Sequence, residues 1–377
     1  MDFTFTEEQL AAAEAARGVF AGVAPDTVPS PALTTGAVAD GLDRTLWTRL
    51  ADADLLSLLT GTEYGGAGLD AIALCLVLRE SGKVLGRVPL LEHSAAAAAI
   101  QAYGGKELAA RLLPSAGSGE LVLTVAAGGS TGHDPAELAV TARRDGDAWV
   151  LDGVQTAVPW AYDADLILVP AHTGAGRSLL APVPRGHSGV ILAEQISTSG
   201  ERLAELHLDA VRITAGDVID AERAWPWLRE LLITGTCALA LGLGEKVLRM
   251  TSEYTGQREQ FGHPIATFQA VAVQAADRYI DLRAMEATLW QAAWRVSSGA
   301  PGALPAAGDV AVAKIWASEG VRRMVQTAQH LHGGFGADTE YALHRYHAWA
   351  KHLELALGPA AAHEEALGDL LAAHPLG

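Results

Sequence analysis

The N-terminal third of the chain carries apolar side chains at the three- and four-residue spacing of amphipathic α-helices. The first pattern opens at Thr6, a residue type that caps helix N-termini, and runs to about Val23. A Gly-Gly-Ala-Gly loop at 65–68 separates two of the later helices. Those later helices are predicted at about 43–60, 70–86, 90–103 and 105–113. We therefore expect a layer of packed helices here.

The pattern changes near Glu120, where short apolar runs bounded by Gly and Asp replace the helical spacing. Such runs are typical of β-strands joined by turns. Strands are predicted at about 121–125, 138–142, 148–151, 166–169, 178–180, 190–192 and 204–208. The tetrapeptide Arg144-Asp145-Gly146-Asp147 has the composition of a hairpin turn. We expect an antiparallel sheet or barrel.

From Pro226 onward the helical spacing returns, and Pro226 itself suits the first turn of a helix. The predicted helices cover about 226–256, 266–297, 307–332, 338–355 and 360–373. Long amphipathic helices with short connections pack as a bundle. The predicted fold is therefore mostly α with a middle β-domain. Its parts are a helical domain at 1–118, a β-domain at 119–222 and a helical bundle at 223–377.

Composition narrows the classes of function. The chain has 377 residues, of which 50% are hydrophobic, so it can bury a large core in two or three domains. A net charge of −17 disfavours a surface for nucleic acid or for an anionic membrane. Cys75 and Cys237 lie in apolar helical contexts and are expected in the core. No leader pattern opens the chain, and charge or Gly interrupts each long apolar stretch, so we expect a cytoplasmic protein without a membrane span.

The stretch from Arg258 to Val271 carries the most distinctive chemistry. Arg258 presents a planar fork of donors that suits phosphate oxygens. Two aromatic side chains and an amide follow it, at Phe261, Phe268 and Gln269. Together these groups could hold a dinucleotide from pyrophosphate to adenine. The plainer alternative is a helix-loop-helix whose arginine forms a surface ion pair.

Several motifs in order resemble the acyl-CoA dehydrogenase family. They are Glu63-Tyr64-Gly65-Gly66-Ala67-Gly68-Leu69, Arg258-x-Gln260-Phe261-Gly262, Phe268-Gln269 and His332-Gly333-Gly334-x-Gly336. The resemblance implies an N-terminal helical domain, a middle β-domain and a C-terminal four-helix bundle, with FAD bound at a subunit interface. It assigns FAD to Arg258, Gln260, Phe261, Phe268, Gln269, His330, Gly333, Gly334 and Thr124.

The catalytic base of the family is missing from its usual position. Counting from Glu340-Tyr341, the position of the usual glutamate is Leu357, which cannot accept a proton. Some members carry the base on the first bundle helix, and the matching position here is near Leu232. Glu354, three residues before Leu357, and Glu230, two residues before Leu232, are the candidate replacements. A surface or ion-pair role is the alternative for both glutamates.

The middle domain also departs from the family pattern. The loop that usually faces flavin and substrate keeps Thr124, Gly129 and Ser130, so Ser130 is a candidate substrate contact. Where the family has Thr beside the flavin ring, this chain has Pro159, which offers neither a hydroxyl nor an N–H group. Trp160 follows directly and is the second candidate substrate contact.

The resemblance extends to an actinobacterial branch linked to steroid side-chain breakdown. It implies FAD-dependent α,β-desaturation of a bulky acyl-CoA or acyl-carrier thioester, of steroid or polyketide type. The electron acceptor would be an electron-transfer flavoprotein or a similar protein. The base would be unusual or would come from a partner chain, in a homo-oligomer or in a hetero-oligomer with a paralogous subunit. The alternatives are a non-catalytic partner subunit and a flavin-dependent oxygenase on the same fold.

A metal site is not expected. His344, His347 and His352 share part of one predicted helix, and helical spacing brings the first two onto one face. No cysteine or carboxylate complement with ligand spacing accompanies them.

Overall fold

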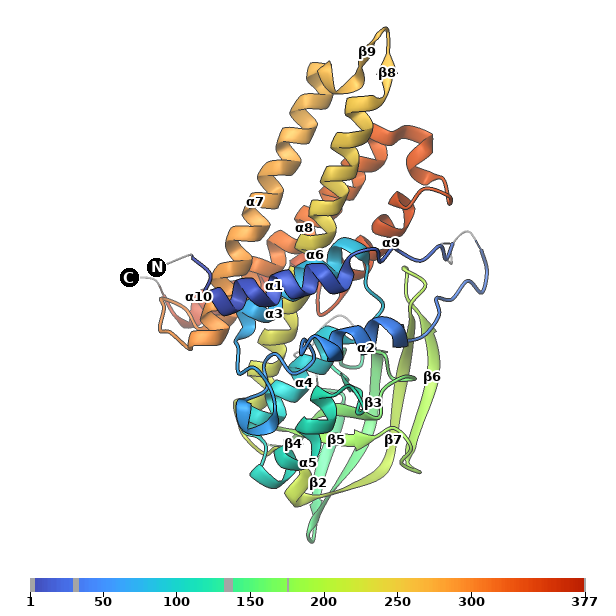
Figure 1. Cartoon of the computed structure of the whole chain (residues 1–377). Helices are drawn as coiled ribbons and strands as arrows, with labels where there is room; N and C mark the ends of the chain where they lie inside the picture. Colours follow the sequence, from blue (N-terminus) through green and yellow to red (C-terminus); the bar gives the residue numbers. More distant parts are fainter. Residues whose placement is uncertain (1–3, 30–33, 132–137, 175, 376–377) are drawn as a thin grey trace.

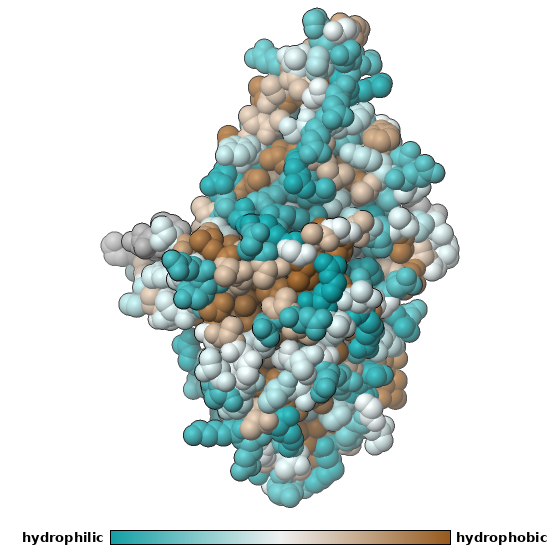
Figure 2. All heavy atoms as spheres, viewed as in Figure 1, coloured by the Kyte–Doolittle hydropathy of each residue, from teal (hydrophilic) through white to brown (hydrophobic). Residues whose placement is uncertain are grey.

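The computed structural model describes residues 4–29, 34–131, 138–174 and 176–375. Long helices form the upper part of the molecule, and a sheet lies below them beside a group of shorter helices (Figure 1). On the surface, hydrophilic residues cover much of the upper tip and the lower part, while hydrophobic residues gather across the middle of this face (Figure 2). The predicted order of helices, strands and helices is confirmed.

The N-terminal helices are held by specific caps. They are α1 (Glu7–Phe20), α2 (Arg44–Asp52), α3 (Ala71–Val84), α4 (Leu90–Tyr103) and α5 (Lys106–Gly117). The Thr6 hydroxyl accepts from the backbone N–H of Gln9, and the Gln9 side chain accepts from the backbone N–H of Thr6. Gln9 also donates to the Asp70 carboxylate, which caps α3 at Ala73. A series of hydrogen bonds therefore fixes α1 against the start of α3.

The second helix is shorter than the sequence predicts. It ends at Asp52, because Asp54 takes the left-handed conformation with φ = 55°. Residues 53–61 then form turns that lead into the short 3-10 helix η1 (Thr62–Tyr64). Gly66 packs against the backbone of this segment, where a Cβ atom would lie 2.1 Å from the carbonyl oxygen of Thr60. The glycine loop is thus a close-packed turn.

The sheet contains β1 (Leu123–Val125), β2 (Val140–Asp145), β3 (Ala148–Pro159), β4 (Leu166–Gly174), β5 (Arg177–Pro184), β6 (Val190–Ile196) and β7 (Arg202–Thr214). The predicted hairpin turn joins β2 and β3, and Gly146 has φ = 63°. Most strand pairs are antiparallel, as expected for an antiparallel sheet or barrel. β4 pairs in parallel with both β1 and β2, so the sheet is mixed.

The bundle consists of α6 (Ala224–Gln257), α7 (Gln269–Ser298), α8 (Ala306–His332), α9 (Leu343–Leu355) and α10 (Ala360–Ala373). Helix α6 is long and apolar enough to cross a membrane, yet 78% of its most apolar window is buried inside the protein. It therefore serves as the core helix. It crosses α3 at glycine contacts, where a Cβ atom on Gly242 would lie 1.9 Å from the Arg79 carbonyl oxygen.

Four charged side chains form a cluster where the three parts of the chain meet. Arg345 of α9 is fully buried, and its Nε lies 2.8 Å from the Asp26 carboxylate. Arg87, between α3 and α4, pairs with Glu201 between β6 and β7 and lies 3.8 Å from Asp26. Two positive and two negative charges thus join the N-terminal loop, the sheet and the bundle.

Candidate active site

Two adjoining cavities lie between the helical layer, the sheet and the bundle. The larger has a volume of about 310 Å³ and the smaller about 90 Å³. They share a wall formed by Leu91, Glu92, Pro159, Leu203, Thr236, His352 and Ala356. These residues come from α4, the end of β3, the start of β7, α6, α9 and the residue that directly follows α9. The site is therefore built where all three parts of the fold converge.

Leu357 and Leu232, which the sequence places at or near the two usual base positions, lie on the wall of the larger cavity. Leu232 is 2% exposed on α6. Leu357 follows the end of α9 in the left-handed conformation with φ = 57°. The His363 ring hydrogen-bonds the Leu357 carbonyl oxygen at 2.9 Å, which helps to fix this turn. The cavity is thus lined by hydrocarbon at the two places where a carboxylate is expected.

The two predicted replacement bases do not reach this cavity. Helix α9 ends at Leu355, so the helical step that was to bring Glu354 onto the face of Leu357 is interrupted. The Glu354 carboxylate instead pairs with Lys351 at 2.7 Å. Glu230 faces a separate cavity between α6, α8 and α10, where burial raises its pKa against the opposing charges of nearby arginines. Both glutamates are therefore misplaced for proton abstraction here.

The predicted site residues of the β-domain differ in their positions relative to the cavities. Thr124 is fully buried and donates to the Pro159 carbonyl oxygen at 2.7 Å, so it supports the wall, and its contact with a cofactor stays a prediction. Ser130 is exposed and lies outside both cavities. Trp160 lines the smaller cavity. Ala157 and Trp160 both have positive φ, 53° and 57°, which bends the end of β3 along the site.

Most residues predicted for the dinucleotide lie far from these cavities. Gln260 and Phe261 belong to a hairpin of β8 (Glu259–Gln260) and β9 (His263–Pro264) at the tip of the molecule (Figure 1). Phe261 is 92% exposed and stands edge-to-face against Phe268, with ring centroids 6.3 Å apart. From Leu232 to Arg258, at the end of α6, the helix rises about 39 Å.

The glycine turn after α8 forms an open cradle. Gly333 has φ = 62°, and a Cβ atom on Gly333 or Gly334 would meet nothing within 4 Å. The neighbouring His332 ring stacks on Tyr254 with centroids 4.3 Å apart. His330 lies in the last turn of α8, beside this cradle.

FAD fits this arrangement if two subunits share one molecule of it. The exposed donors at the tip and the open glycine turn would then belong to one subunit, and the cavity to the other. In one protomer the tip is too far from the cavity for a single dinucleotide to contact both. The residues present therefore fit the cofactor as an interface ligand. Within the part of the chain that the structure describes, no group of His, Cys, Asp and Glu residues could hold a metal ion.

Burial tunes the ionisable groups around the shared wall. Desolvation raises the pKa of Glu92 to about 7, although its own backbone N–H favours the charged form. Desolvation and the nearby Lys314 lower the pKa of His352 to about 4. The Lys314 ammonium is buried against the carbonyl oxygens of Leu353 and Glu354, at 2.8 and 3.2 Å, and burial lowers its pKa to about 8.

Glu92 was not predicted as a site residue, and His352 was considered only as a metal ligand. The available signal for Glu92 was a lone acid in the first turn of an Ala-rich helix. Acids commonly occupy first turns because they complement the helix dipole, so the signal was ambiguous.

The three-part fold, the central cavity and the exposed dinucleotide motif together define a flavin-dependent oxidoreductase. The chain belongs to the acyl-CoA dehydrogenase family. Residues 6–120 match the family's N-terminal domain and residues 234–371 match its C-terminal domain. FAD is accordingly the cofactor of its class.

Individual relatives point in the same direction. The chain is 38% identical to acyl-CoA dehydrogenase FadE27 of Mycobacterium tuberculosis over 338 residues, which cover 88% of this chain and 89% of the relative. It superposes on a chain of the ChsE4-ChsE5 complex of the same organism with a TM-score of 0.90, 36% identity and full coverage of both chains. A variant of the Tcur3481-Tcur3483 steroid ACAD gives a TM-score of 0.88 and 38% identity, covering 97% of this chain and 98% of that one.

Proposed function

We propose that this chain is one subunit of a hetero-oligomeric, FAD-dependent acyl-CoA dehydrogenase that desaturates a bulky acyl-CoA thioester. The proton acceptor comes from a paralogous partner subunit. One observation carries the proposal: Leu357 and Leu232, at or near the positions that the resemblance assigns to the base, are both apolar and line the cavity, while the dinucleotide motif is intact.

The chemistry explains why this observation matters. A C–H bond next to a thioester carbonyl is a weak acid, so its removal needs a positioned carboxylate and donors for the developing oxyanion. Bound FAD supplies the acceptor for the β-hydride. This chain would bind the acyl group in its cavities, exclude water with its apolar walls and offer Arg258, Gln260 and Phe268 to a dinucleotide.

Two further points support a partner. Phe261, Val273, Tyr279 and Ile280 are large apolar side chains that are more than half exposed on the hairpin and on α7. Such a surface favours contact with another chain. The ChsE4-ChsE5 and Tcur3481-Tcur3483 structures are each named for two chains, and the latter is called a steroid ACAD. A steroid-type acyl group is the substrate class that this likeness favours, with an electron-transfer flavoprotein as acceptor and a cytoplasmic location.

The test compares this chain alone with the same chain co-expressed with a paralogue that carries the glutamate. We would measure native mass, flavin per chain and anaerobic bleaching of the flavin by cholanoyl-CoA. We expect weak flavin retention and no bleaching for the single chain, and a stable, flavin-containing, reducible complex for the pair. A single chain that retains FAD and is bleached by the thioester would contradict the proposal.

The source of the base can be tested within the complex. Replacing the partner's glutamate with glutamine should slow bleaching by about 10²- to 10⁴-fold, the usual contribution of a general base. Glu354→Gln and Glu230→Gln in this chain are matched controls and should leave the rate unchanged, because neither side chain lines the acyl cavities. A large decrease in the bleaching rate of either control variant would show that this chain supplies the base.

A further inference from the structure

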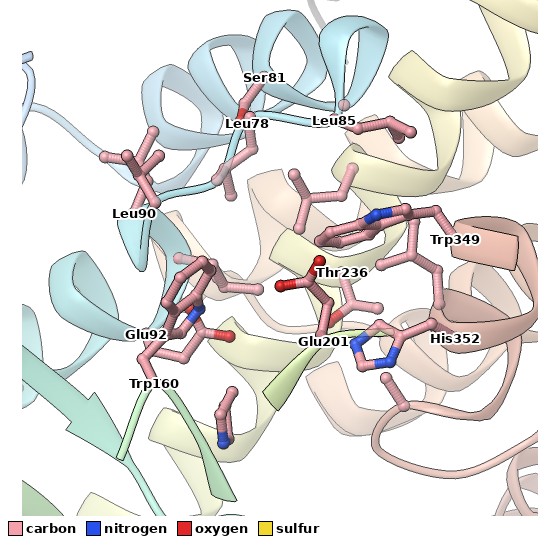
Figure 3. A pocket seen from close by; sticks show the side chains of 18 of the residues that line it. Leu78, Ser81, Leu85, Leu90, Glu92, Trp160, Glu201, Thr236, Trp349 and His352 are labelled. Carbon is pink, nitrogen blue, oxygen red and sulfur yellow. The ribbon is translucent and has the colours of Figure 1, made fainter. Parts of the chain in front are cut away.

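Two titratable side chains, Glu92 and His352, line both cavities at the wall that the cavities share. Glu92 lies on the first turn of α4 and His352 on the last turn of α9, so they come from segments far apart in the sequence. In the close view both side chains border the same space, with Thr236 and Glu201 between them in projection (Figure 3). The surrounding wall is largely apolar, with Leu78, Leu85 and Leu203 among its residues.

The other charged side chains of the wall already have partners. Glu201 pairs with Arg87, and Arg202 pairs with Glu194 at 2.7 Å. The Thr236 hydroxyl donates to the Leu232 carbonyl oxygen at 2.9 Å. Among the described residues, the ring of His352 has no hydrogen bond to another protein group, and the carboxyl of Glu92 meets only its own backbone N–H. Both side chains are only partly buried because they face the cavities, so their unused hydrogen-bonding capacity is open to a ligand.

Their chemistry defines what they could bind. With its pKa lowered by burial, His352 is a neutral imidazole near pH 7, which offers one N–H donor and one acceptor nitrogen. The Glu92 carboxyl accepts hydrogen bonds when ionised and also donates one when protonated. A hydroxyl oxygen needs an acceptor or a donor, and an oxo group needs a donor. The pair can satisfy either.

We propose that Glu92 and His352 recognise a hydroxyl or oxo oxygen on the acyl group, and so select an oxygenated alicyclic thioester over its hydrocarbon analogue. This inference rests on the proposed function, since it places the acyl group in these cavities. Glu92 and His352 are then specificity-determining residues that contact the substrate away from the reacting carbons. The rest of the wall selects for bulk, and these two select for the oxygen.

The alternative role for Glu92 is to stabilise the N-terminus of α4. Acids in a first turn have that effect, and Pro89 provides no side-chain cap there. An internal control exists, because Glu107 lies in the first turn of α5, is exposed and is absent from both cavities. Replacing Glu107 tests the helix effect without touching the cavity.

The experiment measures binding to the assembled flavoprotein by tryptophan fluorescence, because Trp160 and Trp349 both line the smaller cavity. The probes are cholanoyl-CoA, monohydroxylated cholanoyl-CoA isomers with the hydroxyl on different rings, and an oxo analogue. We expect at least one oxygenated probe to bind about tenfold or more tightly than cholanoyl-CoA, as for sites built to pair with a substrate hydroxyl. Anaerobic bleaching gives the matching rates.

The variants separate recognition from folding and from catalysis. Glu92→Leu and His352→Leu should reduce the preference to near unity, because each should weaken binding of the oxygenated probe about tenfold more than binding of cholanoyl-CoA. Glu92→Gln should retain part of the preference, and Glu107→Leu all of it. The inference fails if no oxygenated probe is preferred, if Glu92→Leu weakens all probes equally, or if Glu92→Gln abolishes bleaching without changing binding, since Glu92 would then be the base. If cholanoyl-CoA neither binds nor bleaches the complex, the proposed function fails instead.

Discussion

At the scale of single residues, His93 illustrates how a buried side chain joins elements and sets a pH limit. Its Nδ1 accepts from the backbone N–H of Leu123 at 3.2 Å, so its Nε2 carries the proton and donates to the Ala116 carbonyl oxygen at 3.1 Å. The ring also stands edge-on to Trp47. A neutral imidazole thus connects α5 to β1. Protonation would turn the acceptor for Leu123 into a donor.

We expect the protein to lose stability in acid because of this histidine. Burial lowers the pKa of His93 from 6.5 to about 4. At a pH between these two pKa values, the imidazole is protonated in the unfolded chain and neutral in the native state. The free energy of unfolding therefore falls as pH drops from 6.5 to 4. The loss is about 3 kcal/mol for this group. Urea unfolding between pH 7 and pH 4 should show a shallower pH dependence in His93→Gln, and an unchanged slope would contradict the assignment.

Some residues of the site could be predicted from the sequence, and others could not. Leu357 could be located by counting from a motif, and the structure puts it on the cavity wall. Glu354 could not be excluded by counting, because the helix end that separates it from Leu357 depends on Lys314, which binds the last carbonyl oxygens of α9 from another helix. Glu92 was hidden because its surroundings are contributed by distant segments.

At the scale of elements, α3 and α6 cross with their backbones in close contact. Gly242 touches the Arg79 carbonyl of α3, and Gly82 touches the Leu239 carbonyl of α6 in the same way. Small residues at both points allow the backbones to approach, which places α6 against the helical layer. The walls of the smaller cavity, at Leu78 and Thr236, depend on that approach.

Gly242→Ala should therefore destabilise the protein although alanine favours helices. The added Cβ would meet the Arg79 carbonyl oxygen at 1.9 Å, so the helices must separate. We expect a loss of about 1–3 kcal/mol, the usual effect of overpacking. Gly256→Ala on the same helix meets nothing within 4 Å and should be neutral or stabilising by up to about 1 kcal/mol. Thermal unfolding of both variants tests the contrast, and equal melting temperatures would contradict it.

Elements with local signals were predictable, and those that depend on distant partners were not. Helix α4 was predicted at its observed bounds, because Gly104 and Pro89 flank a continuous helical run. The parallel pairing of β4 with β1 and β2 has no local signal, since it joins segments far apart in sequence. The turn at Asp54 lies in a stretch whose apolar spacing continues past the helix end.

At the scale of the whole molecule, the cluster of Asp26, Arg87, Glu201 and Arg345 connects all three parts of the chain. Glu201 also lines the smaller cavity, so the cluster couples the arrangement of the parts to the shape of the site. Removing one partner leaves opposite charges buried and unpaired, which is more harmful than removing a pair.

Arg345→Met should destabilise the protein by about 3–5 kcal/mol, because it leaves Asp26 without its main partner. The double variant Arg345→Met with Asp26→Asn should recover part of that loss. Chemical denaturation of the single and double variants gives the coupling free energy. A double variant with the summed loss of the two single variants would show that the cluster contributes no coupling.

The exposed hairpin tip has a consequence for how the cell makes this protein. Its aromatic Phe261 stands almost entirely in water in a single protomer. If FAD bridges two subunits as proposed, cofactor retention reports on assembly and not on folding. Unequal synthesis of the two subunits would then leave the surplus chain folded but colourless, so flavin content per chain would measure the balance of expression between two genes.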